Sequence, residues 1–147
     1  MARTLLLVSH TPLSADPTLA LWTDPPGCVG DRLWKMSGLT WDEWWAGFDR
    51  MNVVNQTEWS EPTKGRIKDV RQCMQDRTTL VIGHQARLAL SLPLVEWLLP
   101  NELQNMPGGR THGEWRLLPE PDGRFSDPLI HTAIGVLLRE LCQGEKT

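Results

Sequence analysis

Short apolar runs that alternate with amphipathic helical segments are the feature that most restricts the fold of this chain. Runs this short are typical of buried strands, and the segments between them repeat their apolar residues every three to four positions, as helices do. This alternation predicts an α/β fold: a three-layer sandwich with a mainly parallel sheet and helices on both faces. The four predicted strands are Leu5–Val8, Met51–Val54, Thr79–Ile82 and Glu114–Leu118.

Capping signals mark where several of the helices begin. Thr40 and Glu43 form the T-x-x-E pattern of a capping box. An apolar stripe through Trp41, Trp44, Trp45 and Phe48 follows, and we interpret it as core packing. A further helix is expected from Gln85 to Leu92, with an interruption or restart at Pro93. The remaining predicted helices are 31–36, 63–75 and a last one that begins at Ser126-Asp127-Pro128.

The length and composition indicate one domain, residues 1–147, with an ordinary apolar core. No apolar run approaches the ~20 residues that cross a bilayer, and no export signal is evident, so we expect a cytoplasmic protein without membrane contact. The cysteines Cys28, Cys73 and Cys142 are far apart and form no C-x-x-C pair. That spacing argues against a disulfide framework, a zinc site or an iron–sulfur cluster. We therefore expect no metal and no cofactor.

Charge and aromatic content leave two interpretations open. The net charge is −3, which gives no global attraction to nucleic acid. The stretch from Lys64 to Arg87 is nevertheless basic, and it is either a DNA-binding face or a set of solvated helix charges. The chain has eight Trp and no Tyr. Some of these indoles must be core, and the others are available for stacking on bases or sugars.

Polar residues at the ends of the predicted strands are the candidate site. No Walker loop, G-x-G-x-x-G, G-x-S-x-G or H-E-x-x-H motif occurs in the chain. In doubly wound sheets, ligands bind outside the carboxyl ends of the strands. His10 and Thr11 follow the first strand, Asn52 lies in the second and His84 follows the third. We group the loop that precedes the fourth strand, Arg110 to His112, with them.

Three residues after the first strand could handle the attacking water in a hydrolysis. His10 could position or deprotonate water, or donate a proton to a leaving group. Thr11 could orient water through its hydroxyl, and Asp16 could serve as a general base or stabilise a developing cation. Each also has an ordinary explanation, as a satisfied loop histidine, a turn residue and an Asp before Pro.

Asn52 and the Gly-rich loop before the fourth strand could bind the substrate. An amide inside an apolar strand is costly unless it is satisfied, and the donor and acceptor of Asn52 match the edge of a nucleobase. Alternatively, Asn52 caps its own turn. Arg110 and His112 could contact a phosphate together with the backbone amides of their loop, or they could simply be exposed to solvent.

Five short motifs follow one another between Leu5 and Leu141. LLLVS leads into HTPLS, GDRL begins at Gly30, FDRMNVVN begins at Phe48, and TLVIGHQARLAL and NMPGGRTHGEW come later. In this order the chain resembles the uracil-DNA glycosylase superfamily. The family's water-activating acid or amide corresponds to Thr11, and its signature histidine corresponds to Met106, so His112 is the nearest substitute.

The resemblance implies an uracil-DNA glycosylase-like fold and a role for each candidate. Asn52 would read the pyrimidine edge. Apart from the resemblance, we expect Trp22 and His84 to bind the substrate as well. Gly109 and Arg110 would bind DNA. The implied catalytic residues are His10, Thr11, Asp16 and His112.

The expected activity is hydrolysis of an N-glycosidic bond in DNA by a monomer that needs no cofactor. The target nucleotide would be extruded from the helix, and an abasic site would remain. The departures from the family pattern favour an altered or hypermodified pyrimidine over plain uracil, such as a glucosylated hydroxymethylcytosine of phage DNA. The role would then be antiphage defence. Two alternatives stay open: a catalytically inactive DNA- or protein-binding module on this fold, and a transferase that modifies a nucleobase.

Overall fold

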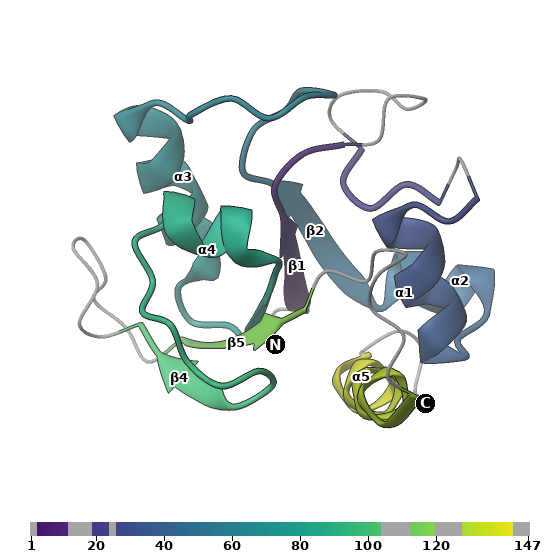
Figure 1. Ribbon diagram of the computed structural model, residues 1–147. Coiled ribbons are helices and arrows are strands. Elements are labelled where there is room, and N and C mark those ends of the chain that lie inside the picture. Colours follow the sequence, from purple (N-terminus) through teal and green to yellow (C-terminus); the bar gives the residue numbers. More distant parts are fainter. Residues whose placement is uncertain (1–2, 12–18, 24–25, 104–112, 120–127, 143–147) are drawn as a thin grey trace.

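A computed structural model of the protein describes residues 3–11, 19–23, 26–103, 113–119 and 128–142. This part of the chain forms a five-stranded sheet in the order β2-β1-β3-β5-β4 (Figure 1). Four strands run parallel, and β4 runs antiparallel to its neighbour β5. The strands are β1 (Thr4–Val8), β2 (Phe48–Asn52), β3 (Thr79–Ile82), β4 (Pro100–Glu102) and β5 (Glu114–Leu118).

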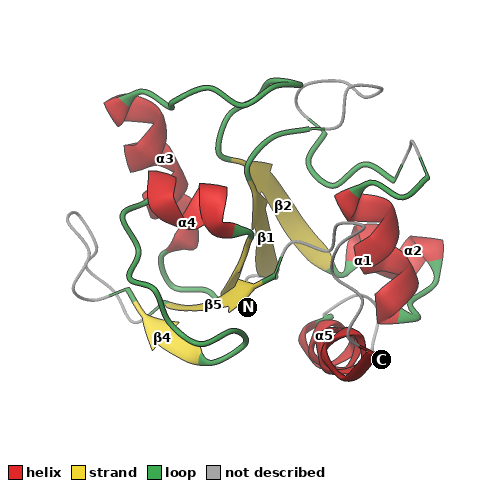
Figure 2. Ribbon diagram, in the orientation of Figure 1, coloured by secondary structure: helices red, strands yellow, loops and turns green. Residues whose placement is uncertain are grey.

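Helices cover both faces of the sheet, as the sequence predicts. Successive strand residues point to opposite faces, and β1 is apolar on both. Its residues Leu6 and Val8 join the core under α1, α2 and α5, whereas Leu5 and Leu7 join the core under α3 and α4 (Figures 1 and 2). The helices are α1 (Val29–Ser37), α2 (Trp41–Ala46), α3 (Lys64–Met74), α4 (His84–Ala89) and α5 (Pro128–Leu141).

The predicted count of four strands is wrong, because β4 lies where the sequence indicates a loop. This strand is only three residues long and begins with Pro100, which pairs with Arg116 of β5. Proline is tolerated at the start of an edge strand, where its missing N–H faces solvent. So short a strand has no apolar run to mark it. The predicted helix 85–92 is also too long, since α4 ends at Ala89 and the chain around Pro93 is not helical.

The Trp-rich helix is correctly capped but shorter than its apolar stripe. Glu43 N donates to Thr40 Oγ1 at 3.2 Å, and Thr40 N donates to Glu43 Oε1 at 2.9 Å, which confirms the capping box. The helix ends at Ala46, and Phe48 already begins β2, three residues earlier than predicted. Trp44 is fully buried, but the Trp41 side chain is 41% exposed, so the prediction that the whole stripe is core is wrong at Trp41.

No helix in the described ranges is long and apolar enough to cross a membrane.

Candidate functional site

The carboxyl ends of four parallel strands meet at one edge of the sheet. Val8 of β1 lies beside Asn52 of β2, and Ile82 of β3 lies beside Leu118 of β5. The structure therefore brings the polar residues that end or follow β1, β2 and β3 to a single edge. These residues are His10, Thr11, Asn52 and His84.

A buried hydrogen bond joins the first two strands at this edge. Asn52 is 1% exposed, and its Nδ2 donates to Oγ1 of Thr11, which is fully buried. Asn52 is therefore bonded to a residue 41 positions away. The sequence left open that Asn52 only caps its own turn. The bond to Thr11 shows that its side chain also makes a long-range contact.

The Thr11 hydroxyl also donates a hydrogen bond within the protein. Its Oγ1 donates to the carbonyl of Leu19 at 3.1 Å, and its backbone N–H donates to the carbonyl of Gln56 at 3.0 Å. A hydroxyl has only one O–H to donate. Thr11 is thus placed to hold Asn52, which is a different use of the hydroxyl from the orientation of water that the sequence suggested.

The backbone keeps the two loops together beyond the ends of β1 and β2. Val53 N donates to Val8 O at 2.8 Å, and Val54 N donates to Ser9 O at 3.1 Å. These bonds fix Ser9 beside the chain that leaves β2. The residue that follows Ser9, His10, is consequently held at the same edge as Asn52.

The imidazole of His10 is oriented by its neighbour. Ser9 Oγ lies 2.9 Å from His10 Nδ1, and the His10 side chain is partly exposed. No other hydrogen bond of this ring is found within the part of the chain that the structure describes, so Nε2 is the nitrogen left to act on a ligand. A partly exposed imidazole with one fixed nitrogen suits a proton acceptor or donor.

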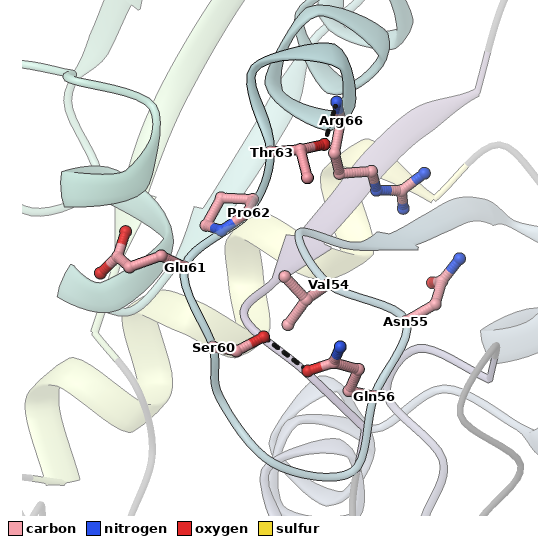
Figure 3. A pocket seen from close by; sticks show the side chains of 8 residues that line it. All are labelled: Val54, Asn55, Gln56, Ser60, Glu61, Pro62, Thr63 and Arg66. Carbon is pink, nitrogen blue, oxygen red and sulfur yellow. Dashed lines mark hydrogen bonds between the residues drawn. The ribbon is translucent and has the colours of Figure 1, made fainter.

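A pocket of about 290 Å³ with mostly polar walls lies inside the loop that links β2 to α3, and its lining begins at Val54, two residues after Asn52 (Figure 3). Across it, Ser60 Oγ donates to Gln56 Oε1 at 2.6 Å. Arg66 lines the pocket and donates from Nη2 to the carbonyl of Asn52 at 2.7 Å and from Nε to that of Val53 at 3.0 Å. Sequence reasoning counted Arg66 only as one charge of a basic stretch. Thr63 was the sequence signal that could have placed Arg66 in the first turn of α3, at the pocket. Thr63 caps this helix, and its Oγ1 accepts a hydrogen bond from Arg66 N at 3.1 Å.

Trp22 belongs to a cluster of indoles. Its ring centroid lies 5.4 Å from that of Trp45 and 6.0 Å from that of Trp41, and Trp34 lies 5.2 Å from Trp41. The guanidinium of Arg50 lies over the Trp45 ring at 4.1 Å.

Arg50 brings positive charge to the same face of the sheet as Asn52. The two residues are two positions apart in β2, so their side chains share one face. Burial lowers the pKa of Arg50 to about 10, while neighbouring Asp49 acts in the opposite direction. The guanidinium therefore stays charged at neutral pH.

His84 begins α4 and is exposed. Its ring lies 4.7 Å from that of Trp97, and Arg87 Nε donates to its Nδ1 at 3.1 Å. These contacts hold the imidazole against residues that follow β3, and none of them reaches Asn52 or Thr11.

Leu103 and Gly113, the described residues on either side of 104–112, lie at the end of the sheet opposite Asn52. Leu103 N donates to Gly113 O at 2.9 Å, and Gly113 packs closely on the carbonyls of Met74 and Arg77, which precede β3. The chain thus leaves β4 and enters β5 at the amino edge, since a loop that precedes a parallel strand joins its amino end. The residues Gly109, Arg110 and His112, and likewise Asp16, lie outside the described residues.

Comparison of the chain with protein-family models, with curated proteins and with solved structures gave no match. The resemblance to the uracil-DNA glycosylase superfamily rests on the sequence motifs alone. Across the residues for which positions are described, no group of three or more His, Cys, Asp or Glu side chains is arranged to hold a metal ion.

Proposed function

We propose that the protein is a DNA glycosylase that releases an altered or hypermodified pyrimidine and leaves an abasic site. The observation that carries this proposal is the buried Asn52–Thr11 pair at the carboxyl edge of the sheet. Ligands of parallel sheets bind at this edge. Enzymes that act on an extruded base read its hydrogen-bonding edge, and an Asn amide supplies one acceptor and two donors for that purpose.

Base reading by Asn52 requires an exchange of hydrogen bonds. In the structure its Nδ2 donates to Thr11 and the side chain is 1% exposed. An incoming pyrimidine would take over this donor. Because one hydrogen bond replaces another, the net free-energy cost of the exchange is small, on the order of 1 kcal/mol.

His10 is the residue that we assign to the attacking water. Its Nδ1 is held by Ser9, which leaves Nε2 to accept a proton from water. The oxygen of that water bonds to C1′ of the deoxyribose as the bond between C1′ and the base nitrogen breaks. The electron pair of the broken bond leaves with the base, which is then protonated.

The other sequence-based assignments remain part of the proposal. Trp22 would stack on the base or its sugar substituent, and His84 would contribute to substrate binding at the same edge. Asp16 and His112 would stabilise the reacting sugar and the departing base, and Gly109 and Arg110 would contact DNA phosphates. No step above depends on Asp16, His112, Gly109 or Arg110, which lie outside the described residues.

The test is an excision assay on a panel of defined DNA duplexes and single strands. They carry uracil, mispaired bases or phage-type modified pyrimidines, and strand breaks are measured after alkali treatment. We expect one class of modified pyrimidine to be excised and Asn52→Ala to slow excision about 100-fold or more. Asn101→Ala, which removes an amide from edge strand β4, is the matched control and should leave the rate unchanged. Full activity in Asn52→Ala would contradict the assigned role of Asn52.

A binding module without catalysis is the second candidate. It is favoured by one observation: Asn52 already spends a donor on Thr11 and is covered. Such a module would hold DNA stably and release no base. Mass analysis of the treated DNA separates the candidates, because a glycosylase removes the base, a transferase leaves it attached with a new substituent, and a binder leaves it unchanged.

A further inference from the structure

The pocket beside Asn52 is polar and contains an arginine held in a fixed position. Its walls include Asn55, Gln56 and Ser60, and Arg66 reaches it from the first turn of α3 (Figure 3). The two hydrogen bonds from Arg66 to the carbonyls of Asn52 and Val53 fix the plane of the guanidinium. An arginine immobilised in this way loses little side-chain entropy when it binds a ligand.

Arg66 retains both donors and charge for a ligand. A guanidinium has five N–H groups; Arg66 uses two on carbonyls, and three are left. Arg77 is paired with Asp49 at 2.8 Å, whereas Arg66 forms no ion pair with a carboxylate of the described residues. Glu61 also lines the pocket, yet its side chain points away from Arg66 in Figure 3.

We infer that Arg66 and this pocket bind a phosphate group, and that in the cell this is a backbone phosphate next to the nucleotide read by Asn52. The planar fork of Arg matches phosphate oxygens, and neutral amide N–H groups such as those of Asn55 and Gln56 are common phosphate partners. Arg66 bonds to the main chain of Asn52 itself. The bound phosphate would therefore belong to the strand whose base Asn52 contacts.

The choice of DNA as the source of the phosphate rests on the proposed function. A free nucleotide or inorganic phosphate presents the same group, so the experiment needs an arm for each source. Binding can be measured without any excision. Loss of the phosphate site and loss of the glycosylase function are thus separate results.

The first arm measures how the Kd for a single-stranded oligonucleotide changes with salt. One phosphate contact contributes about 0.7 to the slope of log K against log salt. We expect Arg66→Gln to lower the slope by about this amount and Arg66→Lys to retain most of it. Lys68→Gln removes the same charge from an exposed position on α3 and should leave the slope unchanged. Equal slopes for Arg66→Gln and the wild type would overturn the DNA contact.

The second arm replaces single phosphates of the oligonucleotide by neutral methylphosphonates. One replacement should weaken binding to the wild type about tenfold and have no effect on Arg66→Gln. Titration with inorganic phosphate and with deoxycytidine 5′-monophosphate completes the set. Suppose that the small ligands bind in a way that depends on Arg66, while oligonucleotide binding is the same for the wild type and Arg66→Gln. This result would support a phosphate site at Arg66 and would overturn DNA as the source of the phosphate.

Unfolding temperatures of the variants guard against a loss of fold, because Arg66 also supports the carbonyls of Asn52 and Val53. Arg66→Lys keeps a charge at this position and serves as the second variant if Arg66→Gln is unstable. If the folded Arg66 variants bind the oligonucleotides and the small phosphate ligands as the wild type does, the phosphate site is overturned altogether.

Discussion

Asn52 at the end of β2 donates its side-chain N–H to the hydroxyl of Thr11, which follows β1 and is 41 positions earlier in the chain. Both residues are buried, at 1% and 0% exposure. The bond joins two loops at the edge where parallel sheets bind ligands. It therefore couples the stability of the fold to the geometry of the candidate site.

Thr11→Val removes the acceptor of this bond with little change in shape. The Nδ2 group of buried Asn52 and the carbonyl of Leu19 each lose a partner. We expect the free energy of unfolding to fall by about 1–3 kcal/mol. Urea denaturation measures the change, and Thr11→Ser, which keeps the hydroxyl, is the control. A Thr11→Val protein as stable as the wild type would show that the bond contributes nothing.

His10→Gln tests the assigned role in handling water. Gln keeps hydrogen-bonding capacity but cannot accept a proton at neutral pH. The rate of base release should fall about 100- to 10,000-fold, while DNA binding is unchanged. Ser9→Ala, which removes only the partner of Nδ1, should cause a smaller decrease. Undiminished base release by His10→Gln would transfer the role to another residue.

Asp31→Asn tests a buried carboxylate in the first turn of α1. Burial alone would raise the pKa of Asp31, but hydrogen bonds from Gly27 N at 2.8 Å and Lys35 Nζ at 3.0 Å bring it below its ordinary value of 3.8. A lowered pKa in the folded state stabilises the fold above the unfolded-state pKa and loses this effect as the pH falls through the folded pKa. We expect Asp31→Asn to cost about 1 kcal/mol at pH 7.

The difference between Asp31→Asn and the wild type should therefore start to shrink as the pH falls below the ordinary value of 3.8, and disappear once the pH is below the lowered pKa of the folded state. Chemical denaturation across a pH series measures it. A difference that persists unchanged at low pH would assign the effect to shape and not to charge.

Two glycine substitutions should have opposite outcomes. A Cβ on Gly30 would lie 2.3 Å from the carbonyl oxygen of Leu21 and 2.5 Å from that of Trp22, so Gly30→Ala must push the Trp22 segment off α1. We expect a loss of about 1–3 kcal/mol. A Cβ on Gly65 has its nearest neighbour at 4.0 Å, and Gly65→Ala in the first turn of α3 should match or slightly exceed the wild type in stability. Thermal unfolding ranks the two, and the reverse order would contradict the packing of α1 on this segment.

Local patterns in the sequence predict most of this fold. Strands β1 and β3 follow from apolar runs that no surface segment would carry, and α2 begins at its capping box. Strand β2 carries Asp49 and Arg50, and the predicted run Met51–Val54 covers only its last two residues. Strand β4 could not be predicted because its pairing with β5, not its own three residues, makes it a strand.

From the sequence, only the location of the site could be predicted, at the carboxyl ends of the parallel strands. That His10, Thr11 and Asn52 share this edge follows from parallel strands. The bond between Asn52 and Thr11, and the contact of Arg66 with the Asn52 carbonyl, depend on how two loops fold over one another. No spacing in the sequence records such contacts. The grouping of Arg110 to His112 with these residues stays a prediction, because the loop lies outside the described residues.

The measurement that tests the account most directly is mass-spectrometric detection of free base released from modified-pyrimidine DNA by the wild type and by Asn52→Ala. The account predicts that the wild type releases one free base for each alkali-labile site, and that a folded Asn52→Ala protein releases at least about 100-fold less in the same time. Equal release by both proteins, or no free base from any of the DNAs, would contradict it.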